Sequence, residues 1–221
     1  MRSAPVLLCL LIGCRSSAPP LSEGEAAADR ACGIVRAFAS AHGWGDRMSD
    51  CFYDDVRVFE TQEGLFDAIR AVHGLPPDAA FPDGVVAALE QRHLMVVTPQ
   101  AYARIAPAYA RQDDAWTRLM AHEIGHRLHV AILDGDEDAM GPPWFFEGFA
   151  VVAAGQQLGD PLAYETADEA LAAVYEDAPL AYRRFGAAVR FFGASHSLPT
   201  LVARAGGPDF ESWLTRPAAA P

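Results

Sequence analysis

Two histidines and a glutamate lie close together in residues 121–126, which read AHEIGH. On a helix, His122 and His126 project from one face a single turn apart, so their imidazole rings can share one metal ion. The side chain of Glu123 points about 100° away around the helix axis and can reach a water molecule on that metal. The spacing therefore predicts zinc binding coupled to general-base chemistry, with Glu123 as the base.

A catalytic zinc site needs a third protein ligand and an open fourth position. The candidates downstream are His129, Asp134, Asp136, Glu137, Asp138 and Glu147. A straight helix would place His129 in line with His122 and His126, so we interpret it as a supporting or surface residue. Glu147 differs because WFFEGFA predicts a second helix, in which Gly148 allows two helices to approach closely. Glu147 is therefore a strong candidate among these for the third ligand, beside His122 and His126.

The motifs HEIGH and PPWFFEGFA together resemble those of the gluzincin zinc peptidases, in particular their short peptidase MA-like group. In that group the glutamate of W-x-x-E-G-x-A is the third ligand, which implies that His122, His126 and Glu147 hold one zinc ion per chain. Residues 182–192 resemble a gluzincin segment that begins with a tyrosine contacting the substrate oxyanion, which implies this role for Tyr182. The resemblance covers about residues 85–216 and implies a zincin fold and zinc-dependent hydrolysis of peptide bonds.

Some features of related enzymes are missing. The G-x-M-E-N motif that anchors a free amino terminus in aminopeptidases is absent, which favours an endopeptidase. Many gluzincins carry an acid four residues past the third ligand, which orients a histidine, but Val151 stands there. His196 is a second candidate for the oxyanion donor besides Tyr182. The alternative function is a non-catalytic lipoprotein that binds a partner in its cleft, although such a module has no need of Glu123.

The first fourteen residues resemble a bacterial lipoprotein signal, with MR, an apolar run and then LIGC. The resemblance implies a signal peptide over residues 1–13, lipid on Cys14 and a flexible tether over residues 14–25. Arg15 stands where an aspartate retains such proteins at the inner membrane in some bacteria. We therefore expect attachment to the outer membrane, facing the periplasm. A plain secretory signal and an apolar N-terminal helix are the alternatives.

Charge and cysteine content limit the partners. Acidic residues outnumber basic ones by 29 to 17, so the chain would repel nucleic acid and anionic lipid. We expect a peptide or protein substrate and leave the oligomeric state open. Cys32 and Cys51 remain as an even pair in an oxidising compartment, which favours a disulfide over two buried thiols. No apolar run reaches the roughly eighteen residues that predict a membrane-spanning helix.

Hydrophobic periodicity predicts the elements that position these residues. The expected helices cover 26–42, 65–74, a zinc-binding helix from Asp113 or Asp114 to a stop at Gly135, then 144–158, 167–176, 182–194, 198–206 and 208–216. The expected strands cover 51–60 and 93–98, and residues 85–89 fit either a helix or a strand. Trp144, Phe145, Phe146 and Phe149 are expected in the helix core rather than in a substrate pocket.

We therefore expect an α+β fold. A small N-terminal α/β part with a short sheet packs on the active-site helix, and an all-helical C-terminal part follows. Residues 26–216 would form a single zincin-like domain, and residues 217–221 a tail. The length of 221 residues and an apolar content of 51% suit one domain with a sizeable core.

Overall fold

The computed structural model describes residues 22–157 and 161–216. The expected signal peptide, the lipidation site Cys14, most of the expected tether and the tail lie outside the described residues. The elements run in the order α1 (Glu23–Ala41), β1 (Asp55–Phe59), α2 (Gln62–His73), β2 (Ala87–Glu90), β3 (His93–Val97), α3 (Pro99–Ile105), α4 (Ala115–Ile132), α5 (Pro143–Ala153), α6 (Ala167–Val174), α7 (Ala181–Ser195), α8 (Leu198–Ala205) and α9 (Phe210–Leu214).

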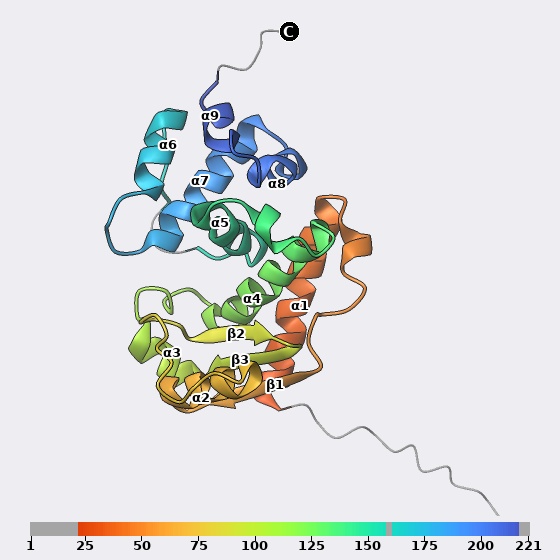
Figure 1. Ribbon diagram of the computed structural model, residues 1–221, viewed down its shortest axis with the longest axis vertical. Helices are drawn as coiled ribbons and strands as arrows, with labels where there is room; N and C mark the ends of the chain where they lie inside the picture. Colours follow the sequence, from red (N-terminus) through yellow and green to blue (C-terminus); the bar gives the residue numbers. More distant parts are fainter. Residues whose placement is uncertain (1–21, 158–160, 217–221) are drawn as a thin grey trace, which may run out of the picture.

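The molecule divides into a part with a sheet and a part made of helices (Figure 1). The sheet lies with α2 and α3 in the lower part of the view, and α5 to α9 form the upper part. Helix α4, which carries HEIGH, lies between them and contacts α1, α5 and β2. The expected α+β fold, with a small sheet followed by an all-helical part, is confirmed.

The sheet has three strands in the order β1-β3-β2. Strand β1 runs parallel to β3, whereas β2 pairs with β3 antiparallel and forms an edge. The two-residue turn between β2 and β3 has positive φ at both Gln91 and Arg92, as a tight hairpin turn requires. Residues 85–89, which fitted either a helix or a strand, thus end in an edge strand beside α4.

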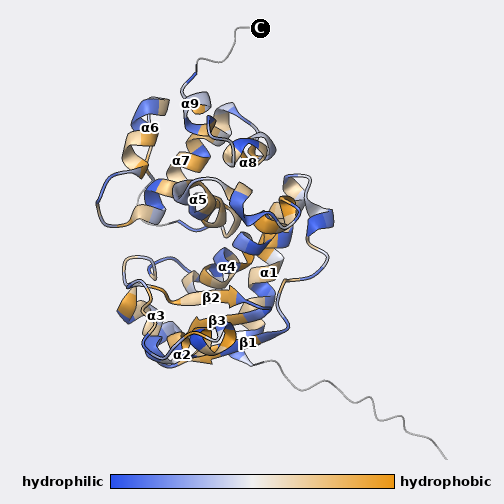
Figure 2. Ribbon diagram, viewed as in Figure 1, coloured by the Kyte–Doolittle hydropathy of each residue, from blue (hydrophilic) through white to orange (hydrophobic). Residues whose placement is uncertain are grey.

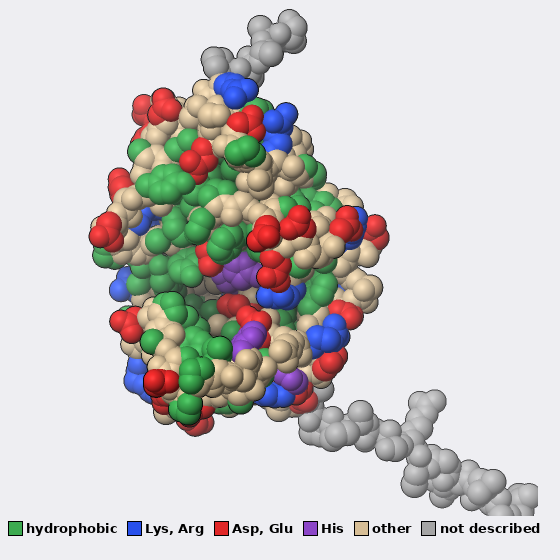
Figure 3. Space-filling view, viewed as in Figure 1, with side chains coloured by type: hydrophobic (Ala, Val, Ile, Leu, Met, Phe, Trp, Pro, Cys, Tyr) green, Lys and Arg blue, Asp and Glu red, His purple; other side chains and the backbone are tan. Residues whose placement is uncertain are grey.

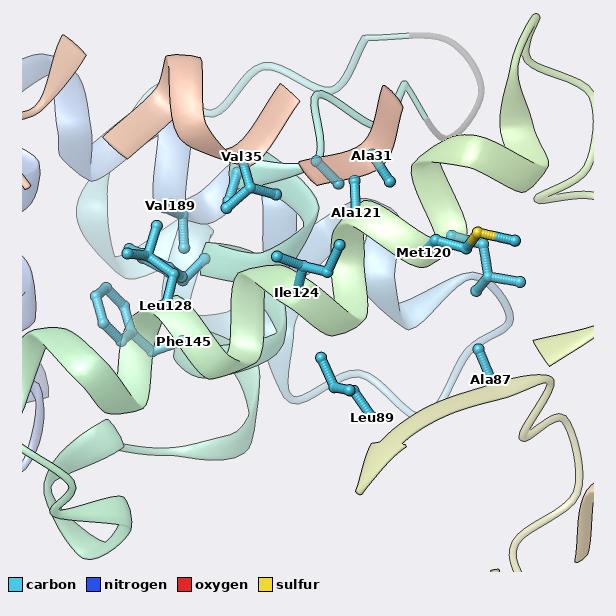
Figure 4. Close-up of a cluster of buried hydrophobic side chains, with 14 of the residues drawn as sticks. Ala31, Val35, Ala87, Leu89, Met120, Ala121, Ile124, Leu128, Phe145 and Val189 are labelled. Atoms are coloured by element: carbon cyan, nitrogen blue, oxygen red, sulfur yellow. The ribbon is translucent and has the colours of Figure 1, made fainter. Parts of the chain in front are cut away.

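Helix α4 is packed against apolar side chains on opposite sides. Figure 4 shows Ala31 and Val35 of α1 on one side of α4, and Leu89 of β2 on the other. Ile124 and Leu128 of α4 are fully buried. Apolar residues also run along the central strand β3 (Figure 2). This packing fixes the rotation of α4 about its axis, and with it the direction of the histidine side chains.

The N-terminal boundary of the folded part differs from the prediction. The Ser22 hydroxyl accepts from the amide of Glu25 at 3.2 Å, and the Glu25 carboxylate accepts from the amide of Ser22 at 2.8 Å. This reciprocal cap starts α1 at Glu23, so the expected tether ends earlier than residue 25. A Cβ on Gly24 would lie 2.9 Å from the Val58 side chain, which shows that this first turn packs closely on β1.

A disulfide joins Cys32 of α1 to Cys51, in agreement with the prediction. It ties α1 to the segment that enters β1. Helices α3 and α5 differ from the sequence-based expectation. Helix α3 was not predicted, although Thr98 caps it and Pro99 begins it. Helix α5 ends at Ala153 rather than near residue 158, because Gly155 adopts a positive φ of 61°.

The start of α4 also differs in detail from the prediction. Asp114 stands at the N-cap, but its side chain makes no capping hydrogen bond and its φ is 58°. Gly135 does help to end the helix, because its amide donates to the Val130 carbonyl at 2.9 Å. Within residues 22–157 and 161–216, no helix has the length and apolar character needed to cross a membrane.

Candidate metal centre

Two close helix contacts bring the predicted ligands together. A Cβ on Gly125 would lie 3.3 Å from both Ala150 Cα and Ala153 Cβ, so α4 and α5 approach closely there. A Cβ on Gly148 would lie only 2.6 Å from the Phe185 carbonyl oxygen, so α5 and α7 also pack backbone to backbone. The first contact sets α5 against the histidines of α4, and the second sets α7 against α5.

The donor atoms of His122, His126 and Glu147 converge on one point. The Nε2 atoms of the two histidines lie 3.1 Å apart, and Glu147 Oε2 lies 3.1 Å from His122 Nε2 and 3.3 Å from His126 Nε2. A tetrahedral zinc ion with bonds of roughly 2.05 Å separates its ligand atoms by about 3.3 Å. The spacing therefore fits a metal ion, and this is the only such group found in the described ranges.

In the absence of a metal, hydrogen bonds and charges within the group shift the pKa values of Glu147 and His122. Burial raises the pKa of Glu147, but hydrogen bonds from His122 and His126 outweigh it and lower the pKa to about 2. Burial lowers the pKa of His122, but the hydrogen bond and charge of Glu147 outweigh this and leave the pKa raised. Without a metal, the raised pKa of His122 therefore favours a proton on that ring opposite the Glu147 carboxylate.

We expect zinc binding to release protons and to weaken as the pH falls. Zinc binds neutral imidazole, and the raised pKa keeps His122 protonated to a higher pH than an ordinary histidine. The affinity should therefore be full above the pKa of metal-free His122 and fall below it by about tenfold per pH unit for each proton displaced. Competition titration with a chelator between about pH 5.5 and about pH 8.5 measures this slope. An affinity that does not change over this range would contradict the account.

Gln156 orients the first histidine, a role that no sequence motif indicates. Its Oε1 lies 3.1 Å from Nδ1 of His122, and the residue is only 6% exposed. An amide oxygen can only accept, so Nδ1 carries a proton, and the neutral His122 ring therefore offers the lone pair of Nε2 to a metal. Arg118 of α4 holds the turn in place by donating to the carbonyls of Ala154 and Gly155 at 2.8 and 2.9 Å.

Replacement of Gln156 by Leu should weaken zinc binding by roughly 10–100-fold, because the His122 ring loses its orienting acceptor. Chelator competition measures the change in zinc affinity. The control is Gln157→Leu, which alters the neighbouring exposed glutamine and should leave the affinity as it is. Equal affinities in Gln156→Leu and the wild type would show that the turn does not orient the metal ligand.

Tyr182 lies beside the group, as the sequence predicts. Its ring centroid is 5.7 Å from that of His122 and the two rings are close to perpendicular. Burial raises the pKa of Tyr182, and the charges of Glu147 and Glu123 raise it further, so the hydroxyl keeps its proton. Tyr109, which belongs to no motif in the sequence, packs edge-on against Tyr182 with ring centroids 5.9 Å apart.

The two other histidine candidates do not join the group. His129 is fully buried, with its ring stacked 4.4 Å from Phe149, so the surface location proposed for it is wrong. Neither ring nitrogen has a hydrogen-bond partner among the residues that the structure describes, and burial lowers the pKa of His129 to about 3. His196 packs against Trp213 beyond the end of α7, with ring centroids 4.4 Å apart.

Replacement of His129 by Leu should stabilise the protein by about 1–3 kcal/mol, because the buried ring nitrogens make no hydrogen bonds within the described part of the chain. Leucine keeps a comparable apolar volume in the core. Urea unfolding of the zinc-loaded variant measures the change in the free energy of unfolding. His196→Leu is the matched control and should change it by less than about 0.5 kcal/mol. A destabilised His129→Leu would reveal a packing or polar role for this ring.

A groove of about 210 Å³ opens beside the ligands. It is lined by Leu89, Glu90, Glu123, His126, Arg127, Val130, Glu137, Met140, Phe146 and Glu147. Figure 3 shows histidine and acidic side chains together in the hollow between the two parts. Trp144, Phe145 and Phe149 are buried in the helix core as expected, but the expectation is wrong for Phe146, which faces the groove. The base candidate Glu123 therefore lies next to the candidate metal ligands and lines an accessible groove.

Comparison with known proteins gives no family assignment. No protein-family model, curated protein or solved structure matches the chain. The residues themselves show a group of two histidines and one glutamate that can hold a metal ion. A function for this chain is therefore argued from the chemistry of these three residues.

Proposed function

We propose that this protein is a zinc-dependent peptidase of the gluzincin type. The observation that carries the proposal is the convergence of His122, His126 and Glu147, with Glu123 next to them on an accessible groove. Two imidazole nitrogens and one carboxylate oxygen are a ligand set that suits zinc. Three protein ligands with an open position are typical of catalytic zinc sites, whereas structural sites have four.

Proton transfer and stabilisation of the oxyanion are assigned to different residues of the chain. Zinc, when bound, supplies an activated water and polarises the carbonyl group of the substrate. The carboxylate of Glu123 takes a proton from the attacking water and passes it to the leaving amine. The hydroxyl of Tyr182 donates a hydrogen bond to the oxyanion of the tetrahedral intermediate.

The surroundings of Glu123 suit a proton shuttle. Burial raises the pKa of Glu123, and the charges of Glu147 and Glu90 raise it further, although His122 and His126 lower it. A carboxyl group with a raised pKa both accepts and returns a proton more readily near neutral pH than an ordinary glutamate.

The edge strand β2 offers a place for an extended peptide. Leu89 and Glu90 at its end line the groove beside His126. An extended peptide can add by main-chain hydrogen bonds to the edge of β2 that faces away from β3, with its side chains alternating between the groove and solvent. This binding mode needs no free terminus of the peptide, which favours an endopeptidase.

We place the enzyme at the bacterial cell envelope. The lipobox-like sequence supports a lipid anchor on Cys14, and Arg15 supports the outer membrane, facing the periplasm. The disulfide between Cys32 and Cys51 is what an oxidising compartment allows. The substrate is a peptide or protein, and the acidic chain disfavours nucleic acid.

The test is peptide cleavage by the purified, zinc-loaded protein. A diverse peptide library is incubated with the protein, and the products are identified by mass spectrometry. We expect cleavage that a chelator abolishes and added zinc restores. Cleavage by thoroughly metal-free protein would contradict the proposal, as would a zinc-loaded protein that cleaves no peptide.

A further inference from the structure

We propose that the groove beside the metal ligands binds a cationic group of the substrate, an ammonium or a guanidinium, through the carboxylate of Glu90. This inference rests on the proposed function for the nature of its substrate. The groove itself is defined by its lining and by the charges of its side chains. A peptidase with such a groove would prefer substrates that carry a positive charge near the scissile bond.

Three of the four carboxylates that line the groove already have a partner or a proposed role, and the fourth is Glu90. Four carboxylates line the groove, those of Glu90, Glu123, Glu137 and Glu147. Glu137 forms an ion pair with Arg127 at 3.2 Å, Glu147 faces the ligating histidines, and Glu123 is assigned as the base. A cation from the substrate would therefore neutralise mainly the negative charge of the Glu90 carboxylate.

Glu90 is only weakly compensated within the protein. Its ion-pair partner in the described part of the chain is His73, at 3.4 Å, which is charged only when protonated. The side chain of Glu90 is 33% exposed, so an approaching cation can reach the carboxylate. Glu90 ends the edge strand β2, next to the place where an extended peptide would lie.

The apolar wall of the groove fits the stem of a basic side chain. Leu89, Val130, Met140 and Phe146 line it together with the carboxylates. Lysine and arginine bury their methylene groups against such a wall while the charged end stays on a polar group. The volume of about 210 Å³ is below the roughly 300–1,000 Å³ of sites that take whole small molecules, so it suits one side chain.

Two parts of a peptide carry such a charge, a basic side chain and a free amino terminus. We therefore compare three matched peptides with the zinc-loaded protein. The first has an internal arginine and an acetylated amino terminus, the second has glutamine in place of the arginine, and the third is the glutamine peptide with a free amino terminus. The proteins are the wild type, Glu90→Gln and Asp168→Asn. Asp168 is exposed at the start of α6, and its replacement makes the same change in net charge.

The wild type should favour at least one cationic peptide over the acetylated glutamine peptide by roughly tenfold or more in kcat/KM, the size of a charge-assisted contact. Glu90→Gln should lose most of this preference, and Asp168→Asn should keep it. A preference for the arginine peptide assigns the groove to a side chain, and a preference for the free amino terminus assigns it to an exopeptidase. Cleavage with no preference, or with a preference that survives in Glu90→Gln, would overturn the inference and leave the proposed function intact.

Binding tests the inference separately from hydrolysis. Dissociation constants of the same peptides, labelled with a fluorophore, are measured by anisotropy with zinc-loaded Glu123→Gln and with Glu123→Gln/Glu90→Gln. If a cationic peptide binds more tightly than the neutral one and this difference depends on Glu90, the inference is supported, whether or not any peptide is cleaved. A lack of cleavage would overturn the proposed function alone. Equal binding of all three peptides would overturn the inference. Zinc content and melting temperature of each variant verify that it is folded.

Discussion

Replacement of Glu123 by Gln is expected to lower kcat for peptide hydrolysis by roughly 10²–10⁴-fold while one zinc ion stays bound per chain. The amide has the shape of the carboxylate but cannot take the proton of the attacking water. The metal ligands His122, His126 and Glu147 are unchanged, so zinc affinity should change little. Steady-state cleavage of a library-derived peptide measures the loss, and metal analysis of the same sample shows that zinc remains.

The matched control is Glu165→Gln, which alters an exposed glutamate before α6, outside the groove. It should retain the activity of the wild type. This comparison also separates catalysis from the alternative of a non-catalytic lipoprotein that binds a partner in its cleft. In that alternative, wild type, Glu123→Gln and Glu165→Gln would show the same absence of hydrolysis.

Replacement of Glu147 by Ala is expected to weaken zinc binding by more than about 100-fold. Loss of a residue that only orients a ligand already costs roughly 10–100-fold, and Glu147 offers a ligand atom itself. The change also leaves the two histidines without the carboxylate that lies 3.1 and 3.3 Å from them. Competition with a chromophoric chelator measures the affinity of both proteins for zinc.

Glu137→Ala serves as the control for this second prediction. Glu137 lines the same groove, but it pairs with Arg127 and is not one of the group that can hold a metal. Its loss should leave zinc affinity near the value of the wild type. If Glu147→Ala bound zinc as tightly as Glu137→Ala, a different residue would have to be the third ligand.

The residues of the candidate metal centre could be predicted because the signal is local. His122 and His126 are one helical turn apart, and helix geometry alone brings their side chains together. Glu147 required a second helix, which its own sequence predicts, and Gly125 and Gly148 allow the close contacts that put it in place. The α+β fold followed from the order of the predicted strands and helices.

The supporting residues could not be predicted because their contacts join distant segments. Gln156 meets His122 across 34 residues, and it does so through a turn set by Gly155 and held by Arg118. The burial of His129 depends on the packing of α5 across α4, which the helical pattern of α4 does not reveal. Ser22 followed by Glu25 is a sequence signal for the start of α1, because the two residues can form a capping box. The polar composition of the same stretch favours a tether instead.

The zinc site is best tested by native mass spectrometry of the purified protein, supplied with zinc and then freed of excess metal. We expect the main species to carry a mass increment of one zinc ion per chain. We also expect Glu147→Ala to lose this increment under the same conditions. A wild-type protein that carries no zinc after this treatment would contradict the claim that His122, His126 and Glu147 form a catalytic zinc site.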